Sequence, residues 1–75
     1  MKGVEVRTAD ASHNELARIA ERCGFRIKEG KKHTKIETQD GKFITVIPRH
    51  ERIKRETAKG IAKAFQQFCN DVIIR

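Results

Sequence analysis

The dipeptide Asp40-Gly41 constrains the fold of this chain more than any other feature of its sequence. It separates two stretches that resemble β-strands, residues 33–38 and 43–47, and an Asp-Gly pair in that position is a strong signal for a β-hairpin. The type I′ turn of a two-residue loop needs positive φ at both central residues, which aspartate and glycine tolerate. We therefore expect an antiparallel pair of strands in the middle of the chain.

A third strand is expected at residues 25–28, where Phe25 and Ile27 alternate with basic residues. In the strand at 33–38, period-two alternation predicts one buried and one exposed face. The residues expected to face inward are Thr34, Ile36 and Thr38. Those expected to face outward are His33, Lys35 and Glu37. The stretch at 43–47 is apolar on both sides, so its buried side is not fixed, and Pro48 should end it because proline has no amide to donate.

Two amphipathic helices are expected around these strands. Ser12 and Glu15 have the spacing of a capping box, which predicts a helix that begins at His13 and ends at Gly24. The second helix should run from about residue 54 to 69, with Gly60 in its interior as a place for a close helix approach or a substrate contact. Its expected buried stripe consists of Ile53, Thr57, Ile61, Ala64, Phe65 and Phe68.

These elements predict one α+β domain over all 75 residues, in the order α-β-β-β-α, with an antiparallel three-stranded sheet covered by both helices on one face. Residues 1–10 are expected to form an arm or edge strand, and residues 71–75 a tail or edge strand. Cys23 and Cys69 do not have the spacing of a zinc site or a disulfide framework, so we expect buried thiols and no metal.

The charge of the chain predicts a polyanionic partner. It contains 17 Lys and Arg against 10 Asp and Glu, a net charge of +7, and the whole excess lies within residues 26–63. Nucleic acid is the first candidate partner and an acidic protein the second. No apolar run of about 18 residues is present, and the first ten residues do not resemble a signal peptide, so a cytoplasmic protein without a membrane partner is expected. The basic residues expected to bind RNA are Arg26, Lys28, Lys31, Lys32, Lys35, Lys54, Arg55 and Lys59.

The three histidines differ in their surroundings. His13, in the first turn of a helix, is expected to be solvated, whereas His33 lies among lysines and is the candidate for proton transfer. His50 is a candidate for a second proton transfer or for orienting a phosphate. A neutral histidine that deprotonates a ribose 2′-hydroxyl, together with lysines that stabilise the phosphorane, suffices to cleave RNA without a metal or cofactor.

The order of motifs resembles HicA-type toxins, the ribonuclease halves of toxin and antitoxin pairs. The resemblance covers about two-thirds of the chain. It rests on Arg22-Cys23-Gly24-Phe25, on Gly30-Lys31-Lys32-His33 in place of the family's Gly-Ser-His turn, on the Asp40-Gly41 hairpin, and on Thr45-Val46-Ile47-Pro48-Arg49-His50, similar to the family's Val-Pro-x-His strand end.

This resemblance implies a double-stranded-RNA-binding-like fold, a type II toxin that cleaves mRNA with His33 as the catalytic base, and a HicB-type antitoxin that covers the active face. The chain departs from the family pattern at Lys32, Ile36 and Glu56, which leaves open whether the full activity is retained. Two alternatives remain. The first is a double-stranded-RNA-binding module without catalysis, suggested by the basic stretch at 54–59, and the second is a basic protein-interaction domain.

Overall fold

The structure, a computed structural model, describes residues 3–75, which form a small α+β fold. The elements in chain order are β1 (Val4–Val6), α1 (His13–Arg22), β2 (Arg26–Glu29), β3 (His33–Glu37), β4 (Phe43–Pro48), α2 (Arg55–Phe68) and β5 (Val72–Ile74). The predicted α-β-β-β-α order is confirmed, and each of the two terminal segments, for which an edge strand was one expectation, contains a short strand. The first two residues of the expected N-terminal arm lie outside the described residues.

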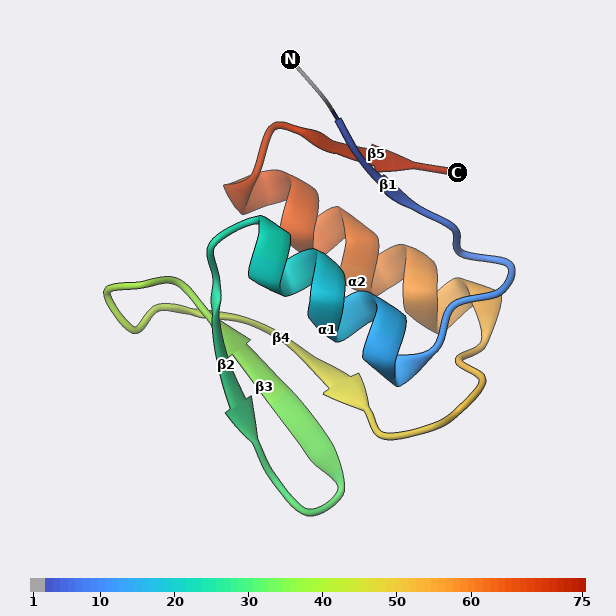
Figure 1. The fold of residues 1–75 in the computed structure, drawn as a ribbon, viewed down its shortest axis with the longest axis horizontal. Helices are drawn as coiled ribbons and strands as arrows, with labels where there is room; N and C mark the ends of the chain where they lie inside the picture. Colours follow the sequence, from blue (N-terminus) through green and yellow to red (C-terminus); the bar gives the residue numbers. More distant parts are fainter. Residues whose placement is uncertain (1–2) are drawn as a thin grey trace.

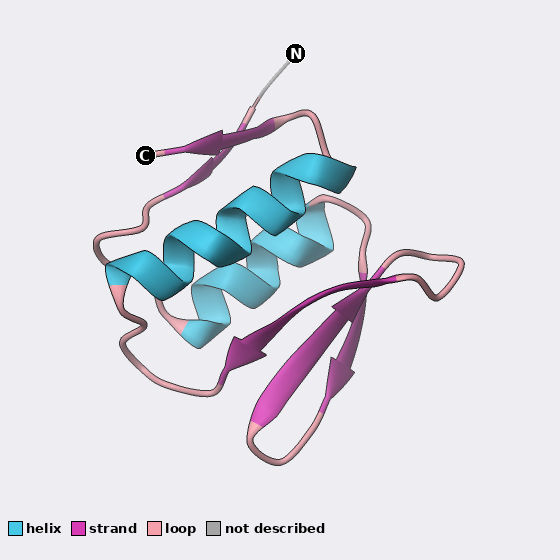
Figure 2. Cartoon of the chain, turned by 180° about the vertical axis from the view of Figure 1, so that it is seen from behind, coloured by secondary structure: helices cyan, strands magenta, loops and turns pink. Residues whose placement is uncertain are grey.

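A three-stranded antiparallel sheet in the order β2-β3-β4 forms one side of the molecule, and both helices pack against one of its faces (Figure 1). On β3, Thr34 and Ile36 are buried while His33 and Lys35 are exposed, as the alternation predicted. Seen from behind, the two helices lie between this sheet and the terminal strands (Figure 2). One face of the sheet is therefore open.

Helix α1 begins and ends where the sequence predicted. The Ser12 hydroxyl accepts a hydrogen bond from the Glu15 amide at 3.2 Å, so Ser12 caps the helix. Cys23 ends it, and Gly24 follows with a φ of 80°, a left-handed conformation that glycine adopts without strain.

The hairpin turn between β3 and β4 differs from the predicted type I′ turn. Only Gly41 has positive φ, at 92°, and the Thr38 amide donates to the Lys42 carbonyl at 2.8 Å, which makes a three-residue loop. Such loops contain a type I turn followed by a left-handed glycine. The Thr38 hydroxyl donates to the Asp40 carboxylate and lowers the pKa of that carboxyl. The prediction of a hairpin was correct, but its turn type was wrong.

A register shift opposite Ile36 and Glu37 decides which side chains of β4 are buried. Phe43 pairs with Glu37 and Thr45 pairs with Ile36, so Ile44 is an extra residue in the strand. As a result Ile44 is buried, whereas Phe43 and Val46 are exposed. The bulge thus brings Phe43 onto the open face, where Val46 already lies.

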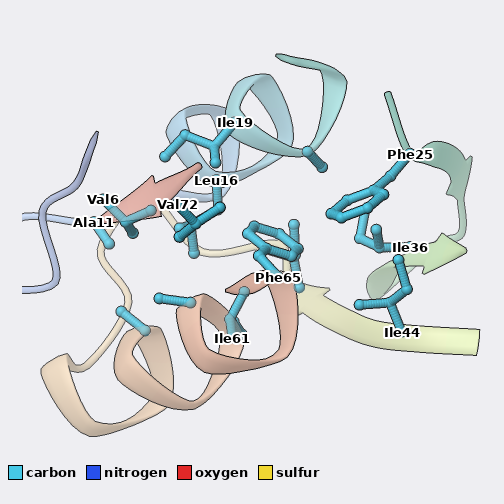
Figure 3. Close-up of a cluster of buried hydrophobic side chains, with 14 of the residues drawn as sticks. Val6, Ala11, Leu16, Ile19, Phe25, Ile36, Ile44, Ile61, Phe65 and Val72 are labelled. Atoms are coloured by element: carbon cyan, nitrogen blue, oxygen red, sulfur yellow. The ribbon is translucent and has the colours of Figure 1, made fainter. Parts of the chain in front are cut away.

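The core is one continuous cluster between the helices and the two sheets. In Figure 3, Phe65 of α2 lies between Val6 and Val72 on one side and Phe25 and Ile36 on the other. The rings of Phe25 and Phe65 are 5.6 Å apart and tilted by 47°. Phe65 is completely buried. A single aromatic side chain therefore joins the two halves of the core.

The buried face of α2 is rotated slightly from the predicted stripe. Thr57 and Phe68, expected to be buried, are exposed, and the small residues Ala58 and Ala62 are buried in their place. A methyl group added at Gly60 would meet nothing within 4 Å. Gly60 therefore does not serve a close approach of another helix.

The two ends of the chain pair with each other and not with the edges of the larger sheet. Val4 lies opposite Val72 in a parallel register, and the Thr8 hydroxyl donates to the Arg75 carbonyl at 2.8 Å. Val6 and Thr8 are both buried. Each expected edge strand is thus a strand of a separate two-stranded sheet. No helix within residues 3–75 has the length and apolar character needed to span a bilayer.

Candidate functional site

His33 is the first residue of β3 and is exposed at the end of the open face. Its carbonyl accepts a hydrogen bond from the Gly30 amide at 3.0 Å. A Cβ atom at position 30 would lie 2.7 Å from the same carbonyl oxygen, so the turn requires glycine there. Lys31 and Lys32 belong to this turn, directly before His33 in the chain, and both are exposed.

The open face of the sheet is basic with an apolar patch. We define it by the side chains that point away from the helices, which are Arg26 and Lys28 of β2, His33, Lys35 and Glu37 of β3, and Phe43, Val46 and Pro48 of β4. Three of the predicted RNA-binding residues, Arg26, Lys28 and Lys35, lie together on it. With three cations and one carboxylate, the face has a net positive charge that favours a polyanion.

Glu37 was expected to be exposed but has only 5% of its surface accessible. Its carboxylate lies 3.3 Å from the Lys35 ammonium and 3.7 Å from that of Lys28. Lys28 and Lys35 are directly opposite each other across β2 and β3, where like charges repel. Glu37 offsets that repulsion and keeps both lysines on the open face.

A second group of basic residues lies along the turn before His33 and the loop from β4 to α2, which we call the basic end. It consists of Lys31, Lys32, Arg49, His50, Arg52, Lys54 and Arg55, with the exposed carboxylates of Glu29, Glu51 and Glu56 interspersed. The Arg49 amide donates to the Lys32 carbonyl at 3.2 Å, and the Arg49 guanidinium donates to the Gly30 carbonyl at 3.0 Å. The guanidinium also lies 3.6 Å from the Glu29 carboxylate. These contacts hold the loop after β4 against the turn before His33.

The start of α2 lies at the same end. The His13 amide donates to the His50 carbonyl at 3.1 Å, and the Ile53 amide donates to the Ala11 carbonyl at 2.9 Å, so the loop is fixed to the start of α1. Lys54 and Arg55 are exposed there, and Lys59 is exposed one turn later on α2. The structure therefore places seven of the eight predicted RNA-binding residues on the open face or at the basic end, and His33 lies on the open face directly after Lys31 and Lys32 of the basic end. Lys59, on α2, lies outside both areas.

His13 is not the solvated side chain that the sequence predicted. It is half-buried, and its Nε2 lies 2.6 Å from the hydroxyl of Thr34, which is only 1% exposed. His13 and His50 line the same surface hollow, together with Arg49. Because Thr34 faces the helices and His33 faces away from them, the hollow lies on the other side of β3 from the His33 side chain. No local sequence pattern predicts this contact, since the two residues are 21 positions apart.

The two cysteines are free and half-buried, at the ends of the two helices. Burial and the neighbouring Cys69 thiol raise the pKa of Cys23 to about 12. Cys23 is therefore a protonated, weakly nucleophilic thiol near neutral pH. The expectation of thiols that act as small hydrophobes agrees with their packing against the core.

Within residues 3–75, no three His, Cys, Asp or Glu side chains come together as a metal site would need. Comparisons of the chain with known protein families, with curated proteins and with solved structures found no match. The side chains of the site themselves determine what chemistry it can perform. An exposed imidazole among ammonium groups can accept a proton next to a bound phosphate.

Proposed function

We propose that this protein is a ribonuclease toxin of the HicA type, which cleaves messenger RNA in the cytoplasm without a metal and with His33 as the base. The observation that supports the proposal most is the position of His33, exposed on the open face directly after two lysines of the basic end. The α-β-β-β-α core, with both helices on one face of the sheet, is the arrangement that a double-stranded-RNA-binding-like fold would have.

In the proposed reaction His33 removes the proton from a ribose 2′-hydroxyl. The freed oxygen attacks the adjacent phosphorus, and the bond from phosphorus to the 5′-oxygen of the next nucleotide breaks. The leaving 5′-oxygen takes up a proton from water, so the products are a 2′,3′-cyclic phosphate and a 5′-hydroxyl. Lys31, Lys32 and Lys35 are the nearest cations along the chain to stabilise the charge that develops on the phosphorane.

The decisive experiment compares cleavage of a single-stranded RNA by the wild-type protein and by His33→Ala, with a chelator present. Because a general base contributes about 10²- to 10⁴-fold, we expect His33→Ala to slow cleavage at least about 100-fold without loss of fold. A substrate with a 2′-deoxyribose at the cleaved position should stay intact. Unchanged cleavage by His33→Ala would refute the assignment of the base, and normal bacterial growth under strong expression of folded wild type would refute the toxin.

The variant for comparison is His50→Ala, which changes the other exposed histidine, in the hollow on the opposite side of β3 from the His33 side chain. We expect His50→Ala to retain most of the activity if His50 only orients a phosphate. A loss as large as that of His33→Ala would show that the two imidazoles share the proton transfers. The partner that we propose is a HicB-type antitoxin that covers the open face, and its binding should block cleavage.

A second candidate is a double-stranded-RNA-binding module without catalysis. The observation that favours it is the exposure of Lys54, Arg55 and Lys59 on the first turns of α2, where they can contact phosphates. Such a module would bind an RNA duplex, lose affinity when these three residues are changed, and tolerate His33→Ala. Cleavage by the wild type decides between the two candidates.

A further inference from the structure

Phe43 is the most exposed large apolar side chain of the described residues, with 54% of its surface accessible, and Val46 beside it is 40% exposed. Both belong to β4 and lie on the open face, opposite Glu37 and Lys35 respectively. Val46 faces outward by its regular pairing with Lys35, and the extra residue Ile44 brings Phe43 onto the same face.

The Lys35 side chain is the cation recorded near the Phe43 ring. The Lys35 ammonium lies 5.9 Å from the ring centroid, within the range of a weak cation–π contact. Lys28 and Lys35 share the buried Glu37 carboxylate, and their side chains are still 58% and 49% exposed. Because an ammonium has three donors, each lysine retains donors for a further acceptor. A flat apolar ring flanked by exposed ammonium groups matches a nucleotide, which joins an aromatic base to a phosphate.

We propose that Phe43 is a stacking platform for one unpaired base of single-stranded RNA, and that Lys28 and Lys35 hold the adjoining phosphates. The proposal rests on the proposed function because it takes RNA as the ligand, and it adds the class of RNA and a binding residue. The antitoxin proposed above would cover the same face and compete with RNA for it, so the tests below use the protein alone. The Lys28 and Lys35 ammonium groups beside Phe43 favour a ligand that carries phosphates.

The position of Phe43 relates the platform to the proposed catalytic residue. His33 and Glu37 are the first and last residues of β3, and Phe43 pairs with Glu37. Four residues of strand span about 13 Å, so the His33 imidazole lies at one end of β3 and the Phe43 ring, on the same face, lies beside the other end of β3. The turns on either side of β3 mark these two ends (Figure 1). One RNA strand along β3 reaches both positions, and the base on Phe43 is a few nucleotides from the phosphate at His33.

The chain contains no tryptophan or tyrosine, so Phe43→Trp introduces a single indole whose fluorescence reports on this position alone. The experiment uses the His33→Ala background, in which RNA stays intact, and titrates the protein with a short oligouridylate. We expect strong quenching of the indole in Phe43→Trp. The matched control is Phe68→Trp, at another exposed aromatic position, 41% accessible on α2, where no quenching is expected.

A second measurement does not depend on tryptophan. Stacking of one base contributes about 1 to 3 kcal/mol, which corresponds to roughly a five- to 150-fold change in affinity. Phe43→Ala should weaken binding of a labelled oligouridylate by at least about fivefold, while Phe43→Tyr should keep the affinity within about twofold. Circular dichroism of each variant checks that the exposed substitution leaves the fold intact. An RNA duplex of the same length should quench the indole far less, because its bases are already stacked.

Three results would overturn the platform. The first is an unchanged indole signal in Phe43→Trp at oligouridylate concentrations that saturate a labelled-oligonucleotide assay, or no binding at all. The second is equal quenching in Phe68→Trp. The third is a blue shift of the indole that grows with protein concentration in the absence of RNA, which would mean that a second copy of this chain covers Phe43. Cleavage by the wild type is measured separately. Cleavage without stacking would refute only the role of Phe43, and stacking without cleavage would refute only the proposed ribonuclease activity.

Discussion

The contact between His13 and Thr34 should stabilise the protein more than the exposure of His13 suggests. His13→Ala removes the hydrogen-bond partner of a hydroxyl that is 1% exposed, 2.6 Å from the imidazole. An unsatisfied buried hydroxyl costs about 1 to 3 kcal/mol. Thr34→Val removes the hydroxyl itself and keeps the shape of the side chain. We therefore expect His13→Ala to lower the free energy of unfolding by about 1 to 3 kcal/mol and Thr34→Val by about 1 kcal/mol or less.

The double variant His13→Ala with Thr34→Val tests the reasoning. Once the hydroxyl is gone, removal of the imidazole leaves no buried polar group without a partner, so the two losses should not add. The coupling free energy should be at least about 1 kcal/mol. Urea denaturation of the four proteins measures it, and the slope of the transition should stay constant. The effect is large for a domain of this size, whose total stability is about 4 to 11 kcal/mol.

The control for this cycle is His33→Ala, which changes an exposed histidine at the start of the same strand and should alter stability by no more than about 0.5 kcal/mol. Additive losses, with a coupling free energy below about 0.3 kcal/mol, would refute the hydrogen bond as a source of stability. A loss from His33→Ala as large as that from His13→Ala would show that the cost comes from the helix start or the strand in general and not from this contact.

Three further predictions concern the core, the glycines and the thiols. Phe65→Ala should lower the free energy of unfolding by about 3 to 5 kcal/mol in urea denaturation, because the ring is completely buried. A cooperative transition near that of the wild type would contradict it. Gly60→Ala should stabilise the protein by about 0.5 to 1 kcal/mol in urea denaturation, because Gly60 is helical with open space around it. Gly41→Ala should destabilise the protein by about 1 to 2 kcal/mol, because the φ of Gly41 is 92°. Destabilisation by Gly60→Ala would contradict this. The pKa of the Cys23 thiol rises from 9.0 to about 12 on folding, so its contribution to stability is present below pH 9 and is lost as the pH rises toward 12. Mass spectrometry should show that iodoacetamide labels Cys23 slowly at pH 8 in the native protein, and faster in Cys69→Ala, which lacks one cause of the raised pKa. Rapid labelling of the native wild type at pH 8 would argue against the raised pKa.

The helix start and the hairpin were predictable because each depends on residues close in sequence. Ser12 and Glu15 are three residues apart, and the predicted cap is present. Asp40 and Gly41 predicted a hairpin at the correct position. The turn type was not predictable from the pair alone, because a three-residue loop needs positive φ only at its last residue and accepts the same two amino acids.

The burial of His13 and Glu37 and the exposure of Phe43 depend on contacts between residues distant in sequence. The half-burial of His13 is due to Thr34, and the burial of Glu37 is due to lysines on two strands. The exposure of Phe43 depends on a bulge that no local pattern indicated in a stretch that is apolar on both sides. The sequence thus placed His33 and the lysines on one open face, whereas the aromatic position on that face is found only from the register of β3 and β4.

The pairing of β1 with β5 determines how early during synthesis this part of the fold can form. Val4 and Val72 are 68 positions apart, so β1 leaves the ribosome long before its partner has been translated. Until then the apolar side chain of Val6 lacks the covering that it has in the finished core. Contacts between residues so distant in sequence are slow to form, and they make the last step of folding coincide with the end of translation of this segment. Truncation before residue 72 should therefore yield a chain that is prone to proteolysis even though both helices and the larger sheet have been synthesised in full.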